Sequence, residues 1–289
     1  MMKNKILKSF FSMIGVSSFL GLIACNQVAN INNLNNPKQE QFHNFVSQKS
    51  ISAILDYVFD NQEQKNQYIN QQSLLDDKYK TKIKQNLIYG NNISASFKSN
   101  SFFTKPIQPI NTANKVLSYD DDSLAKQNWL WFLFNLQNAV FIQDPSIDYF
   151  ESNINDIDIN NKKNNILYKI FYQPKSNKII DYVFHSYENS ITTEETVVYL
   201  LTSEGFIIQL NITKNKESNE PTSVNLLFYI YTFPKLLESK NKLQNFDLKK
   251  YVNDTKSFYD LEDDNSTKRV LFKDKYGGQE LKYTLVDMV

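Results

Sequence analysis

The sequence predicts an α+β fold in which N-terminal helices pack against a C-terminal antiparallel β-sheet. Two observations carry this prediction. Up to about residue 145, apolar residues recur at intervals of three and four, the spacing of a helix with one buried face. After residue 150 the period falls to two, in short runs rich in β-branched and aromatic residues. Short consecutive strands with tight connections indicate an antiparallel meander.

Helices are expected in the region 38–145. Pro37 suits the first position of a helix, and apolar side chains then follow at helical spacing over 42–59. A weaker stripe over 68–87 predicts a second helix that is more exposed to solvent. The segment 89–118 holds Gly, Pro and many Asn and Ser residues, so we expect a long irregular connection there.

The segment 122–143 contains both tryptophans, and its pattern predicts one long helix. Aspartates at its start favour the positive end of the helix dipole, and Pro145 marks its stop. Apolar side chains cover most of the circumference, which is typical of a helix within a core. The alternative is an exposed ridge carrying Trp129 and Trp131, since tryptophan is enriched in interaction hot spots.

The region 146–289 is expected to be rich in β-strands and to form one globular body with the helices. The predicted strands lie at 166–172, 178–187, 195–201, 205–212 and 223–233. One face of the strand at 205–212 is expected to carry the alternate apolar residues Phe206, Ile208, Leu210 and Ile212. Short helices are expected within 235–260, followed by a last hairpin that turns at Gly277 and Gly278.

The first 24 residues have the build of a secretory signal, with lysines at the start and then an apolar run. That run is short of the roughly 20 residues that a membrane-spanning helix needs. It ends in Leu22-Ile23-Ala24-Cys25, which resembles the bacterial lipobox. The resemblance implies a diacylglyceryl group on the sulfur of Cys25 and cleavage before it. The alternative is an ordinary signal peptide or membrane anchor with an incidental cysteine.

Cys25 is the only cysteine, so the chain has no disulfide framework and no cysteine-based metal site. Residues 25–37 are polar and are expected to form a flexible tether behind the lipidated cysteine. Without residues 1–24, 29 basic and 31 acidic side chains remain, a formal charge of −2. We therefore expect the membrane as partner, through the lipid on Cys25, and no nucleic acid.

The composition is biased toward Lys, Asn, Ile and Phe, and Arg269 is the only arginine, as in genomes rich in A and T. This bias and the lipobox resemble the surface lipoproteins of Mollicutes. The run NWLWFLFNL (128–136) resembles the motif of the mycoplasma "aromatic motif membrane proteins". That resemblance implies a lipoprotein on the outer face of the cell membrane, without an assigned activity.

The motifs of common catalytic sites are not found in the sequence. His43 and His185 are the only histidines, and HExxH, GxSxG and Gly-rich phosphate loops are missing. Acidic runs at 156–167 and 260–271 have the spacing of a calcium loop at their starts, but lack its Gly at position six and its Glu at position twelve. Adjacent aspartates at 76–77 point different ways on a helix. We expect no metal, no cofactor and no enzyme activity.

Three functions are compared. The first is a lipid-anchored surface protein that acts by binding or display. The second is a solute-binding lipoprotein of a transporter, which usually needs two lobes around a cleft. The third is an ectoenzyme such as a nuclease or a protease, for which the sequence supplies no recognisable site. The sequence favours the first.

Overall fold

A computed structural model describes residues 37–87, 124–143, 171–187, 191–217, 221–238, 240–260, 276 and 280–289. The chain divides into two compact units, Met1–Glu40 and Gln41–Val289. In the first unit, the described residues 37–40 begin helix α1 (Pro37–Val46). The sheet and the helices that cover it belong to the second unit.

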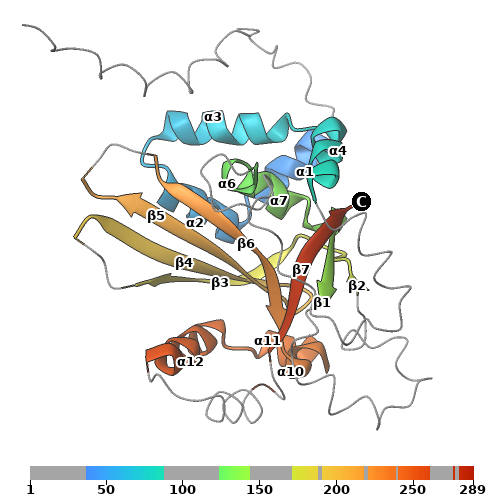
Figure 1. Ribbon diagram of the computed structural model, residues 1–289, viewed down its shortest axis with the longest axis vertical. Coiled ribbons are helices and arrows are strands. Elements are labelled where there is room, and N and C mark those ends of the chain that lie inside the picture. Colours follow the sequence, from blue (N-terminus) through green and yellow to red (C-terminus); the bar gives the residue numbers. More distant parts are fainter. Residues whose placement is uncertain are drawn as a thin grey trace, which may run out of the picture. The chain divides into compact units, whose positions relative to one another are not determined.

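The described strands form one seven-stranded sheet in which every neighbouring pair runs antiparallel. They are β1 (Ala139–Gln143), β2 (Phe171–Tyr172), β3 (Ile179–Ser186), β4 (Thr193–Thr202), β5 (Ile207–Asn215), β6 (Ser223–Thr232) and β7 (Leu281–Met288). Their order across the sheet is β2-β1-β7-β6-β5-β4-β3. Strands β3 to β6 are neighbours in both sequence and space, which confirms the predicted meander. Strand β7 then lies between β6 and β1 (Figure 1).

One face of this sheet packs against the N-terminal helices and the aromatic segment (Figure 1). The helices involved are α2 (Lys49–Val58), α3 (Gln62–Ser73), α4 (Asp77–Asn86), α6 (Leu124–Gln127) and α7 (Trp129–Phe134), with residues 41–46 of α1. The side chains predicted to share one face near β5 are all buried in this core: Phe206, Ile208, Leu210 and Ile212. The α+β class, with helices followed by an antiparallel sheet, is therefore confirmed.

The opposite face of the sheet carries a second buried cluster. It is covered by α10 (Pro234–Glu238), α11 (Lys240–Gln244) and α12 (Leu248–Asp260), which lie between β6 and β7 where short helices are predicted. Val197, Tyr199 and Leu201 of β4 are in this cluster, whereas Val198 and Leu200 are in the first. Strand β4 is thus buried on both faces, which explains why its apolar run is continuous rather than alternating.

The single long helix predicted at 122–143 is wrong. The segment consists of α6, α7, a short 3-10 helix η1 (Leu136–Asn138) and strand β1. Strand β1 lies inside the region 38–145 that was expected to be helical, and it pairs with both β2 and β7. The run AVFIQ of β1 is rich in β-branched and aromatic residues, so pairing with two strands outweighs the helical pattern of the sequence before it.

Other sequence predictions fall outside the described residues. These are the expected tether up to residue 36, the connection 89–118 and the turn at Gly277 and Gly278. Of the strand predicted at 166–172, Phe171 and Tyr172 are described and form β2. The second arm of the predicted last hairpin is strand β7, whose described partners are β1 and β6; the first arm, up to residue 275, lies outside the described residues.

Candidate functional site

The aromatic segment lies in the core and not on a ridge. Trp129 and Trp131 are each 2% exposed, which confirms the first of the two interpretations of this segment. The ring of Trp129 stacks on Tyr68 of α3, with centroids 5.7 Å apart and planes at 23°. The ring of Trp131 meets Tyr79 of α4 edge-on, at 4.9 Å and 89°. Both tryptophans therefore join α7 to the helices that lie over it.

Amide side chains satisfy the polar groups of this buried segment. Gln72 of α3 is 3% exposed; its Nε2 donates to Asn128 Oδ1 at 2.7 Å, and its Oε1 accepts from the backbone N–H of Trp131 at 3.2 Å. Asn128 Nδ2 donates to the hydroxyl of Tyr79 at 2.7 Å. The indole N–H of Trp131 donates to the carbonyl of Leu75 at 3.3 Å. Burial raises the pKa of Tyr79, so its hydroxyl stays neutral.

A groove of about 780 Å³ opens where helices α1 and α2 meet the start of strand β3. Its amide side chains come from three parts of the chain that are far apart in the sequence: Gln41 and Asn44 of α1 with Gln48 just after it, Gln137 of η1, and Asn177 before β3. Strand β3 is at the edge of the described sheet, so this groove runs beside a strand that has one strand partner there.

Three aromatic side chains line the groove. Phe45 and Phe134 have ring centroids 5.5 Å apart and are 4% and 8% exposed, so they belong to the core and reach the groove with little of their surface. Phe42 meets Phe134 edge-to-face at 5.0 Å. Tyr182 of β3 is half-buried. The groove thus combines polar amides with one partly exposed aromatic ring.

Two of the groove amides are fixed by one hydrogen bond each. Gln48 Oε1 accepts from the backbone N–H of Ile179 at 3.2 Å. Asn177 Nδ2 donates to the carbonyl of Phe134 at 2.7 Å. Among the described residues, Gln48 Nε2 and Asn177 Oδ1 have no hydrogen-bond partner, so each half-buried amide keeps one end open to solvent. Asn44 and Gln137 are exposed.

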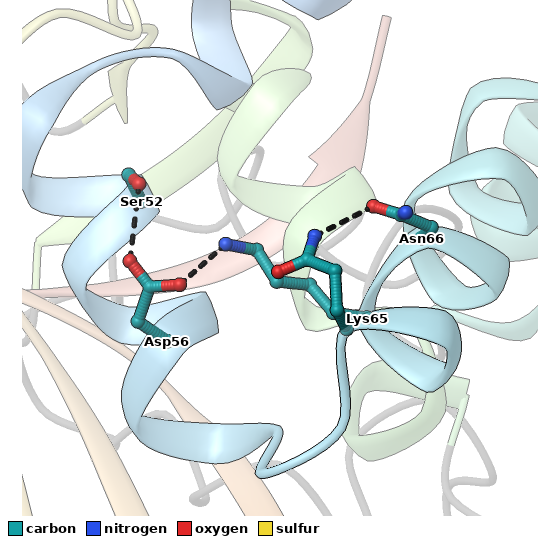
Figure 2. A network of polar contacts seen from close by, with 5 residues as sticks. Ser52, Asp56, Lys65 and Asn66 are labelled. Carbon is teal, nitrogen blue, oxygen red and sulfur yellow. Dashed lines mark hydrogen bonds and ion pairs between the residues drawn. The ribbon is translucent and has the colours of Figure 1, made fainter.

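Helix α2, whose first turn lines the groove with Lys49 and Ser50, makes polar contacts further along its length. Lys65 of α3 donates to Asp56 Oδ1 at 2.5 Å, and the hydroxyl of Ser52 donates to Asp56 Oδ2 at 3.3 Å (Figure 2). The hydrogen bond from Lys65 lowers the pKa of Asp56, and the bond from Ser52 adds to it. The hydroxyl of Tyr57 donates to Glu194 of β4 at 2.8 Å. These bonds connect α2 to the neighbouring helix and to the sheet.

A second concavity of about 560 Å³ lies over strands β4, β5 and β6. It is lined by polar side chains of the sheet such as Gln209, Asn211 and Asn225, and by Tyr251 of α12. The hydroxyl of Tyr251 donates to Glu280 Oε1 at 2.8 Å. Burial, together with the charge of Glu280, raises the pKa of Tyr251. Two of the polar side chains that line this concavity, Tyr251 and Glu280, are therefore already hydrogen-bonded to each other.

The residues that the sequence analysis considered as candidate lipid-attachment, catalytic or metal-binding residues do not come together in the described structure. Cys25 and the acidic run at 156–167 lie outside the described residues, as does the run at 260–271 apart from Asp260 at the end of α12. His43 is exposed on α1, and His185 of β3 meets the ring of Tyr187 at 5.0 Å. Within the described segments, no three His, Cys, Asp or Glu side chains gather as a metal site would require.

The aspartates at 76–77 have a local structural role. Asp76 is the N-cap of α4, and its Oδ1 accepts from the backbone N–H groups of Lys78 and Tyr79 at 2.9 and 3.2 Å. Asp77 is the first residue of the helix. Asp is among the residues preferred at the N-cap, so the role of Asp76 is a capping one.

The groove was not foreseen from the sequence. Its amides belong to residue types that occur throughout the chain, so their abundance hides them. No pattern in the sequence sets them apart. Only the pairing of β3 with β4, and the packing of α2 on β3, brings Gln48 and Asn177 to the same groove.

None of the helices in the described segments combines the length and the apolar character that a membrane crossing requires.

Comparison with known proteins places the chain in a family. No curated protein and no solved structure matches the chain. The family model described as "aromatic cluster surface protein" matches residues 26–277, most of the sequence. The chain therefore belongs to the aromatic cluster surface proteins, which are proteins of the cell surface.

Proposed function

We propose that this protein is a lipoprotein of the Mollicutes type, held on the outer face of the cell membrane by a diacylglyceryl group on Cys25. The observation that supports the proposal is that the end of the signal-like segment and the start of the family match coincide in the sequence. The lipobox-like run Leu22-Ile23-Ala24-Cys25 ends the signal-like segment, and the family match begins at residue 26. A signal peptide is removed from the mature protein, so a family model that starts behind it is what lipoprotein processing predicts.

A diacylglyceryl group on Cys25 would be sufficient to hold the protein stably on the membrane. A single acyl chain gives only marginal and reversible membrane binding, whereas two chains hold a protein stably. A diacylglyceryl-cysteine provides two chains. The mature chain, with a formal charge of −2, would gain no attraction to anionic lipids from its own charge, so the lipid on Cys25 carries the attachment.

The activity that the geometry favours is binding. The groove beside β3 is lined by neutral amides, two lysines and one carboxylate, Asp181, which is exposed. Oδ1 of Asp181 accepts from the backbone N–H of Tyr182 at 2.8 Å. General acid–base catalysis uses titratable groups held in a desolvated site, and the groove offers fixed hydrogen-bonding groups instead. We therefore assign the protein a binding or display role at the surface, and no enzyme activity.

The anchor is tested by Cys25→Ser in the full chain. The variant is expected to lack the lipid and to keep its signal-like segment, because the sequence has no second thiol to accept the lipid. Since the retained apolar segment also partitions into detergent, the mass of the N-terminal peptide is the measurement that distinguishes the variant from the wild-type protein. Mass spectrometry of the N-terminal peptide of the wild-type protein should show a lipid-modified cysteine. Ser47→Ala, a change in the exposed turn after α1, is the matched control. An unmodified Cys25 in wild-type membranes would refute the anchor.

A further inference from the structure

We propose that the groove between α1, α2 and the start of β3 binds a neutral oligosaccharide. This inference rests on the proposed binding function and names the chemical class of its ligand. The groove volume of about 780 Å³ falls within the 300–1,000 Å³ typical of small-molecule sites. A segment of a few sugar rings has the size and the polarity that such a site accepts.

The hydrogen-bonding groups of the groove match hydroxyl groups. Each amide side chain offers both donors and acceptors, and each sugar hydroxyl does the same, so the pairing works in either direction. The charged groups are Lys49, Lys178 and Asp181, all exposed. Because they include both signs, they create no strong field that would select an anion. The groove is thus built for a ligand that is polar and uncharged.

The groove is also partly preorganised. Gln48 is fixed through its Oε1 by the backbone N–H of Ile179, and Asn177 through its Nδ2 by the carbonyl of Phe134. Each amide plane is therefore oriented before any ligand arrives, and its other end is a donor on Gln48 and an acceptor on Asn177. Fixing a side chain in advance removes part of the entropy cost that binding otherwise carries.

An aromatic side chain completes the match. One side of a sugar ring is mostly C–H groups, and it packs well on the face of an aromatic ring. Phe45, Phe134 and Tyr182 all line the groove, but Phe45 and Phe134 are only 4% and 8% exposed, so half-buried Tyr182 carries most of the ring surface that a sugar can reach. A sugar that packs its C–H side on this ring removes apolar surface from water, which a purely polar solute would not do.

The test uses the full chain in a polyoxyethylene detergent, because a detergent with a sugar head group would compete for the groove. Titration calorimetry and saturation-transfer NMR are run with cellotetraose, maltotetraose, chitotetraose and lacto-N-tetraose. Asn44→Ala and Gln137→Ala remove exposed amides without a side-chain hydrogen bond in the described residues, and Gln71→Ala removes an exposed amide of α3 outside the groove.

At least one oligosaccharide is expected to bind the wild-type protein. Asn44→Ala and Gln137→Ala should each weaken that binding about fivefold, the effect of one net hydrogen bond, while Gln71→Ala leaves it unchanged. Binding by none of the four sugars, binding that both groove variants retain in full, or binding of a sulfated analogue alone would overturn the proposal. Lipid modification of Cys25 is read by mass spectrometry on the same preparations, so failure of the anchor is seen separately from failure of the ligand class.

Discussion

The aromatic segment and the groove are built from the same kinds of residue, amides beside aromatic rings, and differ in what the amides bond to. In the aromatic segment, Gln72 is 3% exposed and bonds at both ends to protein groups. In the groove, Gln48 and Asn177 are half-buried and bond at one end among the described residues. The comparison teaches that the unbonded end of an amide, rather than its residue type, distinguishes the amides proposed to bind a ligand from those that hold the core.

The difference has an energetic basis. A buried polar group without a partner costs about 1–3 kcal/mol, so the core demands that each amide be satisfied inside the protein. An amide at the surface exchanges its bond to water for a bond to a ligand at little cost. The aromatic run that gives the sequence its most conspicuous motif therefore stabilises the fold, while the amides of the less conspicuous groove are open to solvent at one end.

The largest effect is expected for Trp129→Ala. The ring of Trp129 is 2% exposed and stacks on Tyr68, so its removal leaves a large cavity between α7 and α3. We expect the free energy of unfolding to fall by about 3–5 kcal/mol. Urea unfolding followed by circular dichroism measures this loss. Leu74→Ala, at a side chain that is 72% exposed, is the control and should change stability little.

The next effect separates a doubly bonded amide from its neighbour on the same helix. Gln72→Ala removes the partners of Asn128 Oδ1, which is part-buried, and of the backbone N–H of Trp131, which is buried. The expected loss in the free energy of unfolding is about 1–3 kcal/mol. Gln71→Ala, on the exposed side of α3, should cost much less. Equal losses in the two variants would show that the buried amide does not hold α7 in place.

Much of the fold could be predicted from periodicity because burial imposes it. The change of period near residue 150 located the meander, and the alternation through Phe206, Ile208, Leu210 and Ile212 gave the buried face near β5. Strand β1 could not be predicted in this way. Its residues follow a helical pattern without a break, and its strand conformation depends on β7, which lies at the other end of the chain.

The groove could not be predicted for a related reason. Its residues become neighbours only through tertiary packing, which sets Gln48 beside Ile179 across more than a hundred residues of sequence. The sequence singled out Trp129 and Trp131, but apolar residues all around a helix are compatible both with burial in the core and with an exposed ridge. The packing of Tyr68 and Tyr79 on the two rings decided between them.

A smaller effect is expected when the groove amides themselves are changed. Gln137→Ala and Asn44→Ala should alter the free energy of unfolding by less than about 0.5 kcal/mol, since both side chains are exposed. Asn177→Ala should cost about 1 kcal/mol, because the carbonyl of Phe134 loses its donor. Thermal melts of the three variants test this order. A large loss for Gln137→Ala would mean that the groove amides, like those of the core, serve stability.

The last effect, also a small one, concerns the ion pair between Lys65 of α3 and Asp56 of α2 (Figure 2). The bond from Lys65 lowers the pKa of Asp56 below its usual 3.8, so the pair stabilises the fold at neutral pH. Because the folded pKa is the lower one, this stability is fully present above 3.8 and is lost as the pH falls through the folded pKa. The side chain of Asp56 is 62% exposed, so the contribution is expected to stay below about 1 kcal/mol.

A double-mutant cycle isolates the contribution of the Lys65–Asp56 ion pair to the free energy of unfolding. Lys65 is 14% exposed, so Lys65→Met alone also changes the packing of its stem, and the difference between single and double variants removes that part. With Asp56→Asn as the second change, the coupling energy from urea unfolding should be favourable at pH 7 and should shrink as the pH is lowered below 3.8. A coupling that is unchanged at acid pH would show that the contact stabilises α2 through packing and not through charge.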